Sequence, residues 1–78
     1  MEFRIFSARL KQLRQENGLT QRKMSEILRV TTNHYQRIEY GTVNIPVSTL
    51  CVLADYFGVT TDYLLGRELS EGRESDKG

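Results

Sequence analysis

The sequence predicts an all-α fold of five short helices, and three observations support this. Apolar residues recur at helical spacing along nearly all of the chain as far as Leu65. Threonines stand at three positions where this spacing indicates that a helix begins. Outside these segments, no stretch of four or more residues alternates between apolar and polar, as a half-buried strand would.

The first helix is predicted from an apolar stripe at intervals of three and four residues, made of Phe3, Phe6, Leu10 and Leu13. Asn17-Gly18 should end this helix, because both residue types accept the left-handed backbone conformation. Shorter stripes predict a second helix over residues 21–28 and a third over residues 32–40.

Residues 41–46 have the composition of a loop, and the end of the chain carries two further helices. A fourth helix is predicted from Leu50, Leu53, Ala54 and Phe57, and Gly58 should end it. A short last helix should cover about 61–65 and end at Gly66.

One local pattern occurs three times, as Leu19-Thr20, Val30-Thr31 and Val59-Thr60. In each pair the threonine side chain can cap the start of a helix. The apolar residue before it can pack on the fourth helical residue, as a hydrophobic staple. We therefore expect helices to begin directly after Thr20, Thr31 and Thr60.

The chain has 78 residues, which is enough for one domain, expected over residues 1–66. From residue 67 to 78 it is polar and almost without apolar side chains, so this tail is expected to be disordered. The net charge is only +1. Binding to nucleic acid would therefore depend on locally placed charges and not on a generally basic surface.

Other classes of protein find little support. No apolar run is long enough to span a bilayer or to act as a secretory signal. The one cysteine, Cys51, cannot form an internal disulfide, which favours a reducing cytoplasm. His34 is the only histidine and has no partners at metal-ligand spacing, so we expect neither a metal nor another cofactor, and no enzymatic activity.

The second and third helices are separated by three residues, Arg29-Val30-Thr31, and so they should cross steeply. This is helix-turn-helix geometry, with the motif over residues 20–41. On the third helix Tyr35 and Ile38 define the buried side, while Asn33 and Arg37 point almost directly away from it. An amide can pair with adenine and a guanidinium with guanine, so this face could read bases or be merely solvated.

The chain also resembles the phage-repressor-type helix-turn-helix family, called the xenobiotic response element family as well. The resemblance spans about residues 6–66. Its segments, in order, are Arg9-Leu10-Lys11-Gln12-Leu13-Arg14, Gly18-Leu19-Thr20-Gln21, Val30-Thr31, Ile38-Glu39-Tyr40-Gly41, Leu53-Ala54-Asp55-Tyr56-Phe57-Gly58-Val59 and Asp62-Tyr63-Leu64-Leu65-Gly66. It implies a compact five-helix, lambda-repressor-like DNA-binding domain of bacterial, phage or mobile-element origin.

The resemblance also implies roles for single residues. Thr32, Asn33 and Arg37 match base-reading positions, and His34 could add a base or phosphate contact. The positions matching phosphate or backbone contacts are Gln21, Tyr40 and the loop from Thr42 to Asn44. Arg22 could contact a phosphate or be merely solvated. Arg14 and Glu39 match an ion pair that joins the first and third helices.

The chain departs from the family pattern in two places. Arg29 stands where the family usually has glycine, because this turn residue often has a positive φ. Its charge could reach a phosphate, or the residue could simply be tolerated. Met24-Ser25 stands where the family prefers leucine-alanine, and both replacements are compatible in size.

The function implied is that of a sequence-specific transcriptional regulator, acting as a repressor on a pseudo-palindromic double-stranded DNA operator. Part of an apolar set in the last two helices is expected to form a homodimer contact: Tyr56, Phe57, Tyr63, Leu64 and Leu65. An antitoxin or a controller of a restriction system is also compatible with this function, and a regulatory protein partner could control it. The alternative is a protein-interaction module that keeps this fold with little DNA binding, which the near-neutral charge favours.

Overall fold

The computed structural model describes residues 3–67, which form five helices and no strand. The helices are α1 (Arg4–Glu16), α2 (Gln21–Leu28), α3 (Thr32–Tyr40), α4 (Val47–Phe57) and α5 (Thr61–Leu65). The all-α, five-helix prediction is confirmed. The expected disordered tail lies, from residue 68 onward, outside the described residues.

The starts of α2, α3 and α5 follow from local capping. The Oγ1 atoms of Thr20, Thr31 and Thr60 accept hydrogen bonds from the backbone N–H of Lys23, His34 and Tyr63, at 3.0, 3.0 and 2.9 Å. Each threonine thus satisfies one of the N–H groups that a helix start leaves without a partner. The three helix starts predicted from the threonines are confirmed.

One core holds all five helices together. Its buried side chains come from every helix: Phe6, Leu10, Met24, Tyr35, Ile38, Leu50, Leu53, Ala54 and Leu64. The three residues that precede the capping threonines, Leu19, Val30 and Val59, are partly buried and pack against this core. Burial of these apolar side chains is the main contribution that holds the short helices in place.

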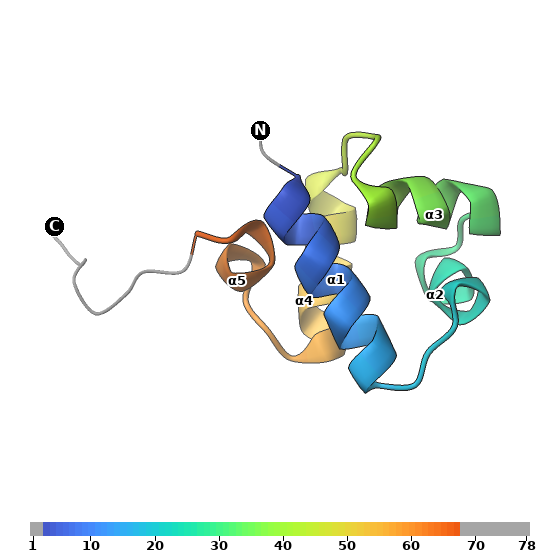
Figure 1. Ribbon diagram of the computed structural model, residues 1–78, viewed down its shortest axis with the longest axis horizontal. Helices are drawn as coiled ribbons and strands as arrows, with labels where there is room; N and C mark the ends of the chain where they lie inside the picture. Colours follow the sequence, from blue (N-terminus) through green and yellow to red (C-terminus); the bar gives the residue numbers. More distant parts are fainter. Residues whose placement is uncertain (1–2, 68–78) are drawn as a thin grey trace, which may run out of the picture.

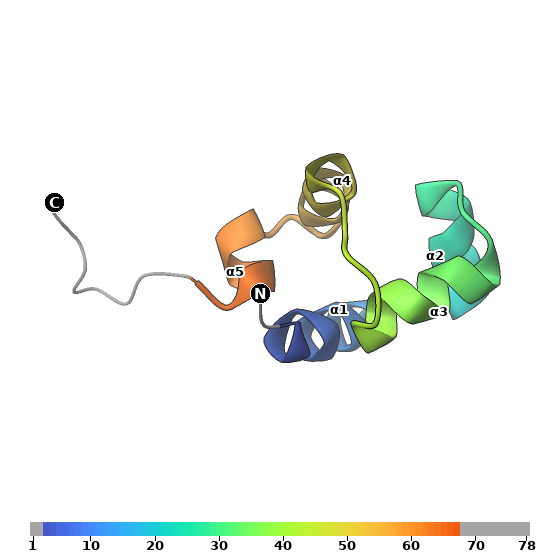
Figure 2. The ribbon, with the colours of Figure 1, turned by 90° about the horizontal axis from the view of Figure 1, so that it is seen from above.

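The helices are arranged with α1 in the centre, α2 and α3 at one end, and α5 at the other (Figure 1). The view from above shows α3 beside α1 at the edge of the molecule, with α4 away from them (Figure 2). Helix α3 packs against both α1 and α2. One side of α3 is therefore anchored, and its other side is left at the surface.

Gly41 ends α3 in a place where only glycine fits. It has a φ of +78°, and a Cβ atom there would lie 2.6 Å from Ser7 Oγ and 3.1 Å from Phe3 Cβ. The close contact with α1 fixes where the chain leaves α3. The position of this helix end therefore depends on tertiary packing as well as on the local turn.

Helix α5 is attached to α1 by Arg9. The Arg9 guanidinium lies over the Tyr63 ring, 4.3 Å from its centroid, and donates a hydrogen bond to the Tyr63 carbonyl oxygen. Cation–π contact and hydrogen bonding act together here. The burial of Leu64 in the core is a second attachment of this short helix.

Candidate nucleic-acid interface

The motif formed by α2 and α3 is a tight helix-turn-helix. The connector begins at Arg29, whose φ is +59°, the only positive φ of a non-glycine residue among residues 3–67. Its backbone N–H bonds to Glu26 O, and that of Val30 bonds to Ser25 O, which closes the end of α2. The left-handed conformation expected at Arg29 is present, and it allows a connector of only three residues between α2 and α3.

The buried side of α3 is anchored by Glu39. Arg14 donates two hydrogen bonds to the Glu39 carboxylate, from Nε at 2.7 Å and Nη2 at 3.1 Å. The Tyr35 hydroxyl donates to the same carboxylate at 2.6 Å, and Gln21 Nε2 donates at 3.2 Å. Arg14 also donates to the Leu19 carbonyl oxygen. The pair expected between Arg14 and Glu39 thus lies at the centre of a larger network that joins α1, α2 and α3.

The network shifts the ionisation of its members. Burial by itself would raise the pKa of Glu39. The hydrogen bonds from Arg14, Tyr35 and Gln21 lower this pKa by more than burial raises it, so the carboxyl group stays ionised. The hydrogen bond to Glu39 raises the pKa of Arg14. Burial, together with the bond to Glu39, raises the pKa of the Tyr35 hydroxyl far above its ordinary value. Both members of the Arg14–Glu39 pair are therefore ionised at neutral pH.

The outer side of α3 is polar and solvent-exposed. It carries the four residues expected to read bases, all of them exposed: Thr32, Asn33, His34 and Arg37. The buried and exposed positions on this helix agree with those expected from the helical spacing of its apolar residues. One helix thus presents an amide, an imidazole, a hydroxyl and a guanidinium to the surroundings.

The residues expected to contact phosphates fall into two groups. Arg22, Arg29, Tyr40, Thr42 and Asn44 are all exposed. Tyr40 is 64% exposed although it is a large aromatic residue on a packed helix. Arg22 lies 3.7 Å from Glu26 in an open ion pair that costs little to break. These side chains are accessible from solvent at both ends of α3.

Gln21 differs from these residues, because its side chain is engaged inside the protein. Its Nε2 donates to Glu39, and its Oε1 accepts a hydrogen bond from Gln36 Nε2 at 3.0 Å. Its side-chain amide is thus committed to the α1–α2–α3 network. The sequence predicted that Gln21 contacts a phosphate, and it did not predict the hydrogen bond from Gln36. The only sign of Gln36 in the sequence was its position at the edge of the polar face of α3.

The apolar set expected at a dimer contact is only partly available. Leu64 is 0% exposed and belongs to the core, so it is not among the part of the set that could contact a second protomer. Tyr63 is covered by Arg9. Phe57 and Leu65 are partly buried, and Tyr56 is 49% exposed.

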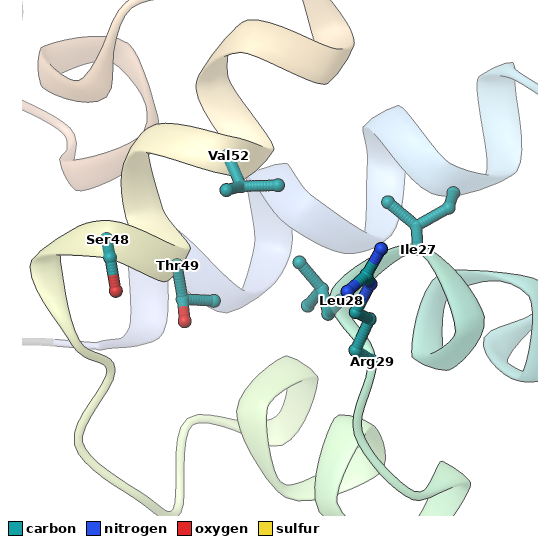
Figure 3. A pocket seen from close by; sticks show the side chains of 6 residues that line it. All are labelled: Ile27, Leu28, Arg29, Ser48, Thr49 and Val52. Atoms are coloured by element: carbon teal, nitrogen blue, oxygen red, sulfur yellow. The ribbon is translucent and has the colours of Figure 1, made fainter.

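A shallow groove lies between the end of α2 and the first half of α4 (Figure 3). It has a volume of about 310 Å³ and is lined by Ile27, Leu28, Arg29, Ser48, Thr49 and Val52.

Within residues 3–67, no three His, Cys, Asp or Glu side chains are grouped so that they could hold a metal ion. In the same part of the chain, no helix is long and apolar enough to cross a membrane.

Comparison with known proteins gives consistent matches. The helix-turn-helix family model matches residues 10–64. The HTH-type transcriptional regulator ImmR of Bacillus subtilis is 38% identical over 69 residues, which are 87% of this chain and 54% of that protein. The SPbeta prophage-derived uncharacterized HTH-type transcriptional regulator YonR, of the same species, is 36% identical over 61 residues, 78% of this chain and 56% of its own length.

The chain thus spans about half the length of the curated relatives it matches. No solved structure matches it closely enough to be informative. The family model covers most of the described residues, including the whole of α2 and α3. The chain therefore belongs to the helix-turn-helix family, as a protein of the phage-repressor type.

Proposed function

We propose that this protein is a sequence-specific, double-stranded DNA-binding transcriptional regulator of bacterial or phage origin, and that it acts as a repressor. In this proposal α3 enters the major groove, and α2 lies across the phosphate backbone. The observation that carries it is the two-sided nature of α3. Its inner side is fixed through Tyr35, Ile38 and the buried Glu39, while Asn33 and Arg37 on its outer side are exposed.

The chemistry of the outer side suits base recognition. Arg37 can donate two hydrogen bonds to guanine O6 and N7, and Asn33 can form a bidentate pair with adenine. Both ImmR and YonR are named transcriptional regulators. Arg22, Arg29, Tyr40, Thr42 and Asn44 would supply phosphate contacts that orient α3 without reading sequence.

We propose further that the protein binds as a homodimer to two half-sites about one helical turn apart. A single short helix reads too few base pairs for high selectivity, and a two-fold dimer doubles the number of bases read. Tyr56 on α4 is the exposed aromatic residue of the set expected at the contact between protomers. Sedimentation of the wild-type protein and of Tyr56→Ala, with one-half-site and two-half-site duplexes, tests this part.

Selection of bound duplexes from a random pool, followed by titration of the enriched sequence, tests DNA recognition. Wild-type protein should enrich one pseudo-palindromic sequence. Arg37→Ala should weaken binding to that sequence and relax the preference at one position, at a cost of about 1–3 kcal/mol. Arg67→Ala, which removes the same charge at the end of α5, is the matched control.

The net charge of +1 favours a second candidate, a protein-interaction module with little DNA binding. The same titration separates the two candidates. An absence of complex with any duplex at low salt would support the interaction module, because electrostatic attraction to phosphates is strongest there.

A further inference from the structure

A buried hydroxyl group lies directly beneath one of the residues proposed to read bases. Ser25 on α2 is 4% exposed. Its Oγ atom is 2.6 Å from the carbonyl oxygen of Arg22 and 3.3 Å from Oγ1 of Thr32, the first residue of α3. Thr32 itself is exposed. Ser25 thus connects the interior of α2 with the surface of α3.

Counting protons fixes the direction of these hydrogen bonds. A serine hydroxyl group has one proton to donate, and a carbonyl oxygen can only accept. The short bond from Ser25 to the Arg22 carbonyl oxygen therefore uses the proton of Ser25. In the contact with Thr32, Ser25 is then the acceptor and Thr32 is the donor.

This direction determines what Thr32 offers to DNA. With its own proton turned inward, the Thr32 hydroxyl group presents only lone pairs outward and can accept but not donate. Phosphate oxygens, guanine O6 and N7, and thymine O4 are all acceptors, so none of them can pair with it. The hydrogen-bond donors in the major groove are the amino groups at adenine N6 and cytosine N4.

We propose that Ser25 is a specificity-determining residue that acts through Thr32. It holds the Thr32 hydroxyl group as an acceptor, so that Thr32 selects an adenine or cytosine amino group and avoids phosphates. This inference rests on the proposed function, because it assumes that α3 enters the major groove. It adds a residue that cannot itself touch DNA, since Ser25 is buried.

The test is a comparison of binding profiles obtained by selection from a random duplex pool. Thr32→Val, which removes the hydroxyl group but keeps the side-chain shape, identifies the base pair that Thr32 contacts. At that base pair, wild-type protein should prefer adenine or cytosine on the contacted strand. Ser25→Ala should reduce this preference about 2- to 10-fold, because the freed Thr32 proton can then be donated to guanine or thymine.

A double-mutant comparison separates this role from a merely structural one. If Ser25 acts through Thr32, then adding Ser25→Ala to Thr32→Val should leave the profile of Thr32→Val unchanged. Ser48→Ala, a serine replacement on the exposed part of α4, is the matched control. Thermal unfolding should show that Ser25→Ala remains folded, because alanine is a strong helix former.

Two results would overturn this proposal without contradicting the proposed function. One is a Ser25→Ala profile identical to that of the selectively binding wild-type protein. The other is an equal effect of Ser25→Ala in the presence and absence of the Thr32 hydroxyl group. A wild-type protein that enriches no sequence would instead overturn the proposed function, and this inference with it.

Discussion

At the scale of single residues, Arg29 is the clearest case of a side chain in a conformation that does not suit it. Its φ of +59° lies in the left-handed region, which glycine adopts without the strain caused by a Cβ atom. Arg29→Gly should therefore raise the free energy of unfolding by about 0.5–1 kcal/mol. Chemical denaturation of the two proteins measures this difference.

Arg29→Ala is the control for this prediction, because it removes the charge but keeps the Cβ atom and the strain. It should give no comparable gain in stability. If Arg29 also contacts a phosphate, both variants should weaken DNA binding to the same extent. Unchanged or lower stability of Arg29→Gly would contradict the strain argument.

Glu39 links stability to pH. Because its pKa in the folded state is lowered below the ordinary 4.5, the folded state binds the proton less readily than the unfolded chain. Its contribution to stability is complete above pH 4.5, and it is lost as the pH falls below 4.5 towards the folded-state pKa. Acid unfolding should therefore begin in this range.

Glu39→Gln should remove this part of the pH dependence and should destabilise the protein at neutral pH by about 3–5 kcal/mol, because it leaves the partly buried Arg14 without its anionic partner. Unfolding free energies from pH 3 to pH 7 give both quantities. Asp55→Asn, an exposed carboxylate on α4, is the charge-matched control. A parallel pH dependence in Glu39→Gln and wild type would contradict the assignment.

At the scale of elements, threonine caps of the same kind stabilise the starts of two helices, α3 and α5, that have different roles. Thr31 is the N-cap of α3, and Thr60 is the N-cap of α5. Replacing either threonine by alanine removes one hydrogen bond to a helix N–H group, and this should lower stability by about 1 kcal/mol in each case. Thermal unfolding of the two variants tests this equality.

Their effects on DNA binding should differ. Thr31→Ala loosens the start of the helix proposed to read bases, so it should also weaken sequence-selective binding. Thr60→Ala loosens the start of α5, away from that surface, and serves as a control of equal stability. Equal losses of affinity in both variants would contradict the assignment of α3 as the reading helix.

At the scale of the whole molecule, the low net charge limits how much affinity phosphates can provide. With a net charge of +1, binding must depend on a few placed cations such as Arg22 and Arg29. Each neutralised phosphate contributes about −0.9 to the slope of log K against log salt concentration. In a two-protomer complex, Arg22→Ala should therefore make this slope less steep by about 2, without changing the preferred sequence.

Titrations at several salt concentrations measure this slope. Arg67→Ala should leave it unchanged, since Arg67 lies at the end of α5. A slope unaffected by Arg22→Ala would mean that the Arg22 side chain is merely solvated and contacts no phosphate. This was the other interpretation of its position at the start of α2.

The sequence alone predicted the elements of this protein and the two sides of α3. The bounds of α2, α3 and α5 agree with those expected, because threonine caps and left-handed helix ends are determined by a few neighbouring residues. The position of Asn33 and Arg37 opposite Tyr35 follows from helical geometry in the same way. Such features need no knowledge of the rest of the chain.

Only the tertiary structure decided which polar side chains are turned inward. Gln21 binds Glu39 and Gln36, and Ser25 reaches Thr32, because the steep crossing of α2 and α3 brings them within hydrogen-bond distance. Leu64 joins the core because α5 packs against α1. These contacts join residues distant in sequence or on different helices. Their formation depends on the angles at which the helices pack, which no local pattern specifies.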